Sequence, residues 1–235
     1  MRLDPETLAE VMEATWPPAA HVPCGPVLLR EGQGGGKRVS AATAEGDWDA
    51  DDLANAEAAM GPHPLFLIRQ GDTALDLALE ARGYRVVDPV VAYVASVADL
   101  AGEGPRHMTT FPHWPPMQIA RALWADAGIG PARLAVMERV TGAKCVVLGR
   151  TSDRASGVAF VACHGSHAML HALEVAPGLR RQGSAQNMLR AAAKWAQGQG
   201  AATLSLVVTE ANAPARALYA RLGMVETGRY HYRQK

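Results

Sequence analysis

The chain has 235 residues, a length that suits one large domain or two small ones. Hydrophobic residues make up 49% and charged residues 20%, which favours a globular protein with a sizeable core and excludes a disordered chain. Its 23 basic residues balance 23 acidic residues, so the formal net charge is zero and no overall field attracts nucleic acid or an anionic membrane.

The cysteines and the N-terminal residues narrow the class of protein further. Cys24, Cys145 and Cys163 are far apart and form no Cys-x-x-Cys pair, so we expect neither a zinc site nor a disulfide framework. Residues 1–16 contain acids and lack the apolar segment of a signal peptide, and no run of about 18 apolar residues could span a membrane. We therefore expect a cytoplasmic protein with no metal, no membrane and no nucleic-acid partner.

The first half of the chain predicts a helix, a hairpin and then alternating helices and strands. Asp4 and Pro5 are typical of a helix start. Residues 26–30 and 37–41 flank the glycine-rich residues 32–36, which predicts a hairpin. That glycine run lacks the Gly-Lys-Ser/Thr ending of a phosphate loop, so we do not expect it to bind phosphate. The later elements are expected as a helix over 49–60, a strand over 65–68, a helix over 73–82 and a strand over 84–95.

The second half follows a Gly- and Pro-rich stretch over residues 102–116, the best candidate for a linker. Expected after it are helices over 117–127 and 132–140, strands over 145–150, 157–163 and 168–175, a long helix after Gly178, a strand over 202–208, a helix over 213–222 and a terminal strand. This alternation favours an α/β fold. Residues 65–83 and 205–223 each contain an expected strand, then a turn residue and then a glycine after the helix, at the same spacing. This indicates a faint internal repeat.

One segment predicts a binding site for an anion. The expected strand ends at Pro177-Gly178, and an Arg-x-x-Gly-x-Ala pattern then opens the long helix. Small residues let a ligand approach the first turn, where free amide groups and the helix dipole attract negative charge. Arginine adds a guanidinium that binds phosphate well. We predict a diphosphate site built from Arg180, Arg181, Gln182, Gly183, Ser184 and Ala185.

A second sequence pattern lies downstream, and the two patterns together are more specific for one protein family than the first pattern alone. Residues 212–224 follow Asn-x-x-Ala-x-x-Leu-Tyr-x-x-x-Gly, with Met224 where phenylalanine is usual. Together the two patterns resemble the GCN5-related N-acetyltransferase (GNAT) superfamily, and the resemblance covers about residues 114–233. It implies the GNAT fold, an α/β (α+β) architecture in which helices flank a mixed central sheet.

The first half is similar to the degenerate N-terminal half of double-module members of the superfamily. The cues are the Lys37–Ser40 segment and a Leu-x-x-x-Gly-Tyr ending at Tyr84. We predict a smaller GNAT-like domain over 1–102, a linker over 103–115 and a catalytic GNAT domain over 116–235. Residues 47–55 are acidic and would repel a diphosphate, so this half is expected to form a wall of the substrate cleft or to be purely structural.

The resemblance implies an acetyl-CoA-dependent N-acetyltransferase that needs no metal and transfers the acetyl group directly to an amine of a small molecule or peptide. Backbone groups near Leu173 and Val175 would pair with the pantetheine arm, and residues 182–185 would hold the pyrophosphate. Asn212 would cap its helix or contact the coenzyme. An idle acyl-CoA-binding protein with a regulatory role is the alternative. The oligomeric state stays open, with a homodimer as one possibility.

Five residues are candidates for proton transfer, four of them as the base and one as the partner of the leaving thiolate. Glu174 is the first choice as a base acting through one water, although an exposed strand glutamate without that role is an alternative. His164, His167 and His171 are further candidate bases because histidine titrates near neutral pH. Tyr219 is the candidate partner of the leaving thiolate, with simple packing as the alternative.

Overall fold

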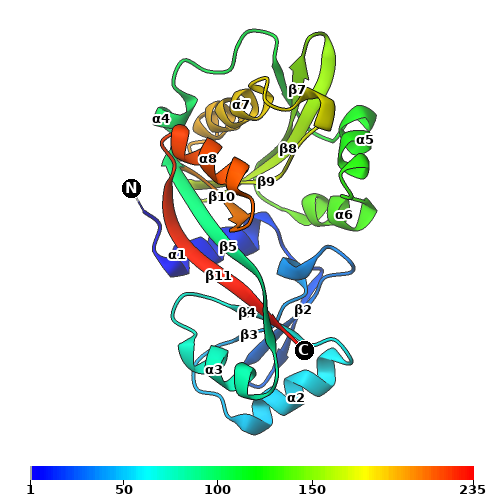
Figure 1. The fold of residues 1–235 in the computed structure, drawn as a ribbon, viewed down its shortest axis with the longest axis vertical. Helices are drawn as coiled ribbons and strands as arrows, with labels where there is room; N and C mark the ends of the chain where they lie inside the picture. Colours follow the sequence, from blue (N-terminus) through cyan, green and yellow to red (C-terminus); the bar gives the residue numbers. More distant parts are fainter. Residues whose placement is uncertain (1) are drawn as a thin grey trace.

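The computed structural model describes residues 2–235, which form two sheets and the helices around them (Figure 1). The strands are β1 Ala20–Cys24, β2 Val27–Glu31, β3 Thr43–Ala44, β4 Leu65–Ile68, β5 Arg85–Ser96, β6 Thr110–His113, β7 Lys144–Thr151, β8 Arg154–His164, β9 His167–Val175, β10 Thr203–Thr209 and β11 Val225–Gln234. The α-helices are α1 Pro5–Thr15, α2 Ala50–Met60, α3 Thr73–Ala81, α4 Val97–Ala101, α5 Gln118–Asp126, α6 Pro131–Arg139, α7 Ser184–Gly198 and α8 Ala213–Arg221, with short 3₁₀ helices η1 Lys37–Val39 and η2 Pro177–Leu179.

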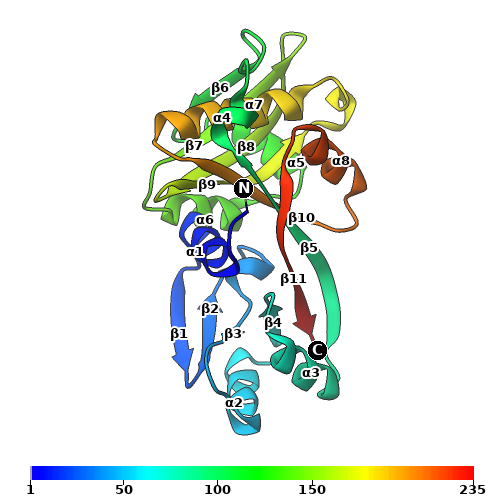
Figure 2. The ribbon, with the colours of Figure 1, turned by 90° about the vertical axis from the view of Figure 1, so that its left-hand side faces the viewer.

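A mixed eight-stranded sheet runs through the molecule in the order β4-β11-β5-β10-β9-β8-β7-β6, and a second sheet has the order β1-β2-β3. The two halves of the chain exchange strands in the large sheet. β5, from the first half, pairs with β10 and β11, and β11, from the end of the chain, pairs with β5 and β4. β5 and β11 run side by side from the upper to the lower part of the molecule (Figures 1 and 2). The mixed sheet flanked by helices confirms the predicted fold class.

Separate cores lie on the two faces of the second-half sheet. α7 packs on one face through Met188, Leu189, Ala192 and Ala196, whose 3.6-residue spacing gives the helix its apolar side. α1 and α5 cover the other face, and α6 contributes to the same core as α5. These two layers fix α7 and β9 relative to each other. None of the helices formed by residues 2–235 has the length and apolar content needed to cross a bilayer.

The sheet opens at the end of β9. β9 and β10 are parallel and pair only from His167–Thr203 to Leu170–Leu206. Beyond that point β10 remains paired with β5, and β9 remains paired with β8. A bulge in the β8–β9 pairing accompanies this change, and Ala172 adopts a φ of 50°. The two parallel strands therefore separate after Leu170 and leave the β10-facing edge of β9 unpaired by β10.

The glycine-rich segment differs from the predicted hairpin. Residues 37–39 form η1 rather than a strand, and β2 pairs with β1 and β3 instead. A Cβ atom on Gly35 would lie only 2.6 Å from Cγ2 of Val136, so the loop needs glycine to pack closely against α6. The hairpin prediction is wrong because the glycines serve this contact between distant segments. The stretch expected as a linker also contains β6, which pairs with β7. The proposed division into two domains stays a prediction.

Candidate active site

The N-terminus of α7 lies beside the end of β9 and is open. Its N-cap residue, Gly183, has a φ of 84° and provides no side-chain cap. The first amide groups of a helix have no partner within the helix, so those at this end can bind an anion. A Cβ atom on Gly183 would meet no atom within 4 Å, so the space in front of the turn is free.

The side chains predicted for the diphosphate site differ in where they point and what they bond. Arg180 donates from Nε to the carbonyl oxygen of Val175 at 3.0 Å, which ties the loop to the end of β9. The Ser184 side chain points into the protein, where its Oγ lies 2.6 Å from Oγ of buried Ser156. Ser184 can therefore offer a ligand only its backbone amide. Arg181, in the loop before the helix, has a φ of 63°, and its side chain is exposed.

The corresponding helix of the first half is α2, and aspartate side chains cap its N-terminus. The Asp49 carboxylate accepts hydrogen bonds from the amides of Asp51 and Asp52, both at 2.9 Å. The Asp52 carboxylate in turn accepts a bond from the amide of Asp49 at 3.0 Å, which completes a capping box. The groups that would bind a phosphate at α2 are already bonded to carboxylates. This contrast supports the expectation that only the second half binds the coenzyme.

Leu173, Glu174 and Val175 occupy the part of β9 that has separated from β10. Leu173 and Val175 pack against the core on the α7 side. Glu174 is half-buried, and burial raises the pKa of its carboxyl group, with Arg180 and Arg133 partly opposing that rise. A carboxylate with a raised pKa is a better base than an exposed one.

Tyr219 lies on α8, close enough to Glu174 to interact electrostatically. The side chain is buried, and its ring centroid lies 5.6 Å from that of Tyr93. Burial raises the pKa of Tyr219 to about 12, and the Glu174 carboxylate and Tyr93 add to the effect. Tyr219 therefore keeps its proton at neutral pH and can act as a hydrogen-bond donor. Asn212 caps α8 by accepting a bond from the amide of Ala215 at 3.2 Å.

The candidate histidines occupy different positions. His164 is exposed near the β8–β9 turn, and His167 bonds Thr203 through Nδ1 at the start of β9, so both lie at the opposite end of β9 from Glu174. His171 is buried between Thr15 and Arg38, with Nε2 2.9 Å from Thr15 Oγ1 and Nδ1 3.0 Å from Arg38 Nη1. Burial, assisted by the charge of Arg38, holds the pKa of His171 well below 6.5, so the ring is neutral.

A cavity of about 340 Å³ lies where β9 and β10 separate, and both halves of the chain line it. Sequence reasoning missed most of it, including Arg38, because that residue reaches the site only through the tertiary fold. A sequence signal that could have found part of the cavity is the Tyr-x-Tyr-Arg pattern at residues 230–233. Tyr230 and Tyr232 do line this cavity.

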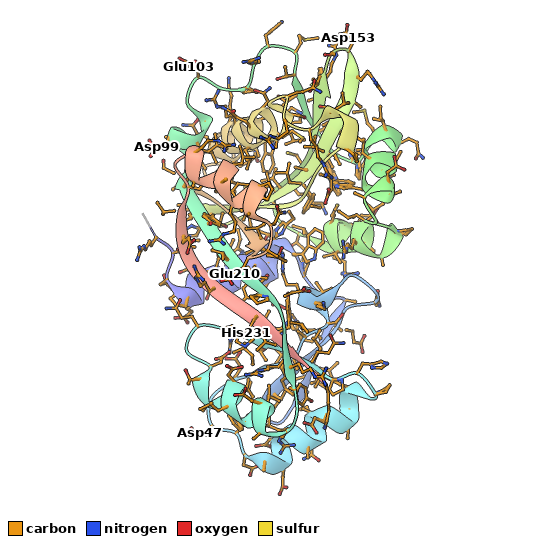
Figure 3. All side chains as sticks on the ribbon, viewed as in Figure 1. Asp47, Asp99, Glu103, Asp153, Glu210 and His231 are labelled. Carbon is orange, nitrogen blue, oxygen red and sulfur yellow. The ribbon has the colours of Figure 1, made fainter. Side chains whose placement is uncertain are left out.

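A larger cavity of about 690 Å³ lies along β11 and the start of α3. It is lined by Glu210 and His231, which Figure 3 labels, together with paired charges such as Arg69 and Asp72. It contacts neither α7 nor β9, so we assign the chemistry to the smaller cavity at the strand separation. Among residues 2–235, no group of three or more His, Cys, Asp and Glu side chains is arranged to hold a metal ion.

Comparison with known proteins agrees with this geometry. The model of the acetyltransferase (GNAT) family matches residues 117–224. The structure of a GCN5-related N-acetyltransferase from Kribbella flavida shares 18% sequence identity, with a TM-score of 0.73 over 98% of this chain and 95% of that one. A tandem GNAT protein from the clavulanic acid biosynthesis pathway shares 13%, with a TM-score of 0.60 over 100% and 97%.

A functionally unknown conserved protein from Staphylococcus epidermidis has the same fold, with 12% identity and a TM-score of 0.68 over 92% of this chain and 93% of that one. Comparison with curated protein sequences gave no match. At these identities the structural likeness establishes the fold, and the family assignment comes from the sequence match. The chain therefore has a GNAT fold, and its residues 117–224 belong to the acetyltransferase (GNAT) family.

Proposed function

We propose that this protein is an acetyl-CoA-dependent N-acetyltransferase that transfers an acetyl group directly to the amine of a small molecule or peptide. One observation carries the proposal: β9 separates from β10 beside the uncapped N-terminus of α7. The separation exposes a strand edge to an extended ligand, and the helix end supplies free amides to its anionic part.

The binding roles follow from these two features. The amides of residues 182–185 would hold the diphosphate, with Arg180 and Arg181 adding positive charge. The backbone edge around Leu173 and Val175, which β10 does not pair with, would pair with the amides of the pantetheine arm. Asn212 caps α8 and, in this proposal, also faces the coenzyme arm. The thioester carbonyl would then lie near backbone donors at the end of β9, where developing negative charge is stabilised.

Two side chains would handle protons during transfer. Glu174 accepts a proton from the acceptor ammonium through one water, and the neutral amine attacks the acetyl carbon. As the carbon–sulfur bond breaks, the nitrogen of the new amide loses its second proton to solvent water, coenzyme A leaves as the thiolate, and the Tyr219 phenol donates a hydrogen bond to that thiolate. Because the pKa of Tyr219 is about 12 and that of an ordinary thiol is about 8.5, full proton transfer to sulfur is uphill. We therefore assign Tyr219 the role of a donor that stabilises the leaving thiolate.

Thiol release from acetyl-CoA over a broad panel of amines tests the activity. We expect the wild-type protein to release coenzyme A with at least one amine, and we expect no release without protein. Binding of acetyl-CoA without release on any amine would instead identify the alternative, an idle acyl-CoA-binding regulatory protein. Absence of binding would overturn both. The cytoplasmic location and the homodimer stay predictions.

A further inference from the structure

The cavity at the strand separation contains more positive than negative charge. Its charged lining residues are Lys37, Arg38, Asp88 and Arg133. Lys37 and Asp88 form an ion pair at 2.5 Å, so they compensate each other. Two guanidinium groups remain, one from the first half of the chain and one from α6. Among residues 2–235, neither forms an ion pair with a carboxylate within 4.0 Å.

Arg38 is held inside the protein by neutral groups. Its Nη1 donates to Nδ1 of His171 at 3.0 Å, and the phenols of Tyr230 and Tyr232 lie beside the guanidinium. Its Nε is fully shielded from water and has no hydrogen-bond partner among the described residues. Buried donors normally have acceptors, and a buried charge normally has a counter-charge. In this structure Arg38 has no carboxylate counter-charge, and its Nε has no acceptor.

Arg133 adds a second positive charge to the lining of the cavity. It lies on α6 next to the glycine-rich loop, where its Nε is 3.5 Å from the position of a Cβ atom on Gly36. Its side chain is exposed and hydrogen-bonds to no other described residue. It is close enough to Glu174 to lower the pKa of that carboxyl group, although burial dominates that pKa. A group bound by Arg133 would therefore be close to the proposed base.

The position of the cavity separates it from the coenzyme site. Residues 180–185, which would hold the diphosphate, do not line it, whereas His171 and Ala172 of β9 do. Residues 207–209 at the end of β10 form the facing wall. The cavity thus opens at the strand separation, where the acetyl group would lie, and extends toward the first half. A volume of about 340 Å³ suits a molecule the size of an amino acid.

Building on the proposed acetyltransferase function, we infer that the acceptor is a small amine that also carries an anionic group, a carboxylate or a phosphate, which Arg38 and Arg133 bind. The amine would lie at the strand separation, near Glu174, and the anionic group would lie between the two guanidiniums. Arginine presents paired N–H donors that match both carboxylate and phosphate oxygens. Such a ligand provides the counter-charge that Arg38 lacks.

Matched acceptor pairs test this inference. Alanine, β-alanine and lysine are compared with their carboxamides, and phosphoethanolamine is compared with ethanolamine. We expect kcat/KM for at least one anionic member to exceed that of its neutral partner by roughly tenfold or more, because a site built around a charge rejects its neutral isostere. The carboxylate and phosphate pairs show which of the two anions the site prefers.

Variants of the two arginines test whether they cause the preference for anionic amines. Arg133→Gln is the main variant because its exposed side chain has no structural bonds, and we expect it to reduce the preference for the anionic member by about tenfold. Arg38→Gln should do the same, with its folding checked by circular dichroism. Arg121→Gln, on α5 and outside the cavity, is the matched control and should leave the preference unchanged.

The outcomes distinguish this inference from the function on which it rests. Equal turnover of anionic and neutral amines, unaffected by Arg133→Gln, would overturn the inference and leave the acetyltransferase function standing. If no member of the panel is acetylated, thermal shift of the coenzyme A-loaded protein decides the matter. Stabilisation by anionic amines that Arg133→Gln abolishes would support the inference, and no stabilisation by any of them would overturn it. Binding of coenzyme A in the same assay reports separately on the proposed function.

Discussion

Thr15 and His171 are 156 positions apart in the chain, yet a hydrogen bond of 2.9 Å joins Thr15 Oγ1 to His171 Nε2. The Thr15 hydroxyl donates its hydrogen to the carbonyl oxygen of Val11, at 2.5 Å. Its oxygen must therefore accept the Nε2 proton of His171, which leaves Nδ1 free to accept the bond from Arg38. This chain of bonds fixes the neutral ring in one tautomer and connects α1, η1 and β9 behind the cavity.

The buried state of His171 predicts a pH dependence of stability. The pKa of His171 is lowered in the folded protein by burial and by Arg38, whereas the unfolded chain has the ordinary value of 6.5. Below that pH the unfolded state binds a proton that the folded state does not. The free energy of unfolding should therefore decrease as pH falls below 6.5, by about 1.4 kcal/mol per pH unit from this residue.

Urea denaturation of wild type and His171→Gln between pH 7.5 and 5.5 measures this effect. The variant should be less stable at pH 7.5, and its stability should fall less steeply with decreasing pH. Parallel pH profiles for the two proteins would show that His171 does not carry the predicted proton linkage.

Tyr219→Phe should lower kcat roughly hundredfold with little change in acetyl-CoA affinity, because it removes the hydrogen-bond donor that stabilises the leaving thiolate and keeps the ring. The packing against Tyr93 is preserved, so the variant should fold normally. Tyr84→Phe, which removes a phenol bonded to Glu57 in the first half, is the control and should keep the wild-type rate. An undiminished kcat in Tyr219→Phe would mean that the tyrosine only packs.

Glu174→Gln tests the proposed base through the pH profile. Because burial raises the pKa of Glu174, wild-type kcat/KM should fall with decreasing pH through a point above the ordinary value of 4.5. The variant should be slower at neutral pH and should lack that acidic decline. Assaying both proteins with the same amine cancels the titration of the substrate. Wild-type activity and an unchanged profile in the variant would instead support the reading of Glu174 as a strand residue without a catalytic role.

The strand exchange predicts that the C-terminal strand is anchored in the first half. Arg233 in β11 is only 5% exposed, and it donates from Nε to Asp76 at 2.6 Å and from Nη1 to the carbonyl oxygen of Tyr84 at 3.1 Å. Asp76→Asn should destabilise the protein by about 2 kcal/mol, because a buried cation loses its counter-charge while water screens part of the loss. Asp99→Asn, at an exposed position on α4, should change stability by less than about 0.5 kcal/mol in the same denaturation experiment.

Local sequence patterns were sufficient to predict the strand and helices that form the proposed coenzyme site. The strand end, the glycine at the start of α7 and the position of Tyr219 on α8 each depend on residues close together in sequence, so their spacing predicts their arrangement. The acceptor side depends on contacts between distant segments. Nothing near Arg38 indicates that it will meet His171, and the contact of Gly35 with Val136 is equally invisible in the sequence.

The exchange of β5 and β11 between the two halves could not be predicted from the sequence. The second half and residues 49–96 of the first half have the expected succession of elements, because the helix and strand periods can be recognised in their sequence. The strand that pairs with β5 or β11 is determined by the whole sheet, because the alternating pattern of a strand is compatible with more than one neighbour. The residues that line the cavity come together only after this choice has been made.

Binding of acetyl-CoA to Gly183→Glu, measured by isothermal titration calorimetry, tests the diphosphate site at α7 most directly. Gly200→Glu is the matched control, because Gly200 lies just beyond the other end of α7 with the same φ of 84° and open space around it. Both variants carry the same charge and the same backbone strain. We predict no measurable binding to Gly183→Glu and wild-type affinity in Gly200→Glu. Wild-type affinity in both variants would contradict the placement of the coenzyme at this helix.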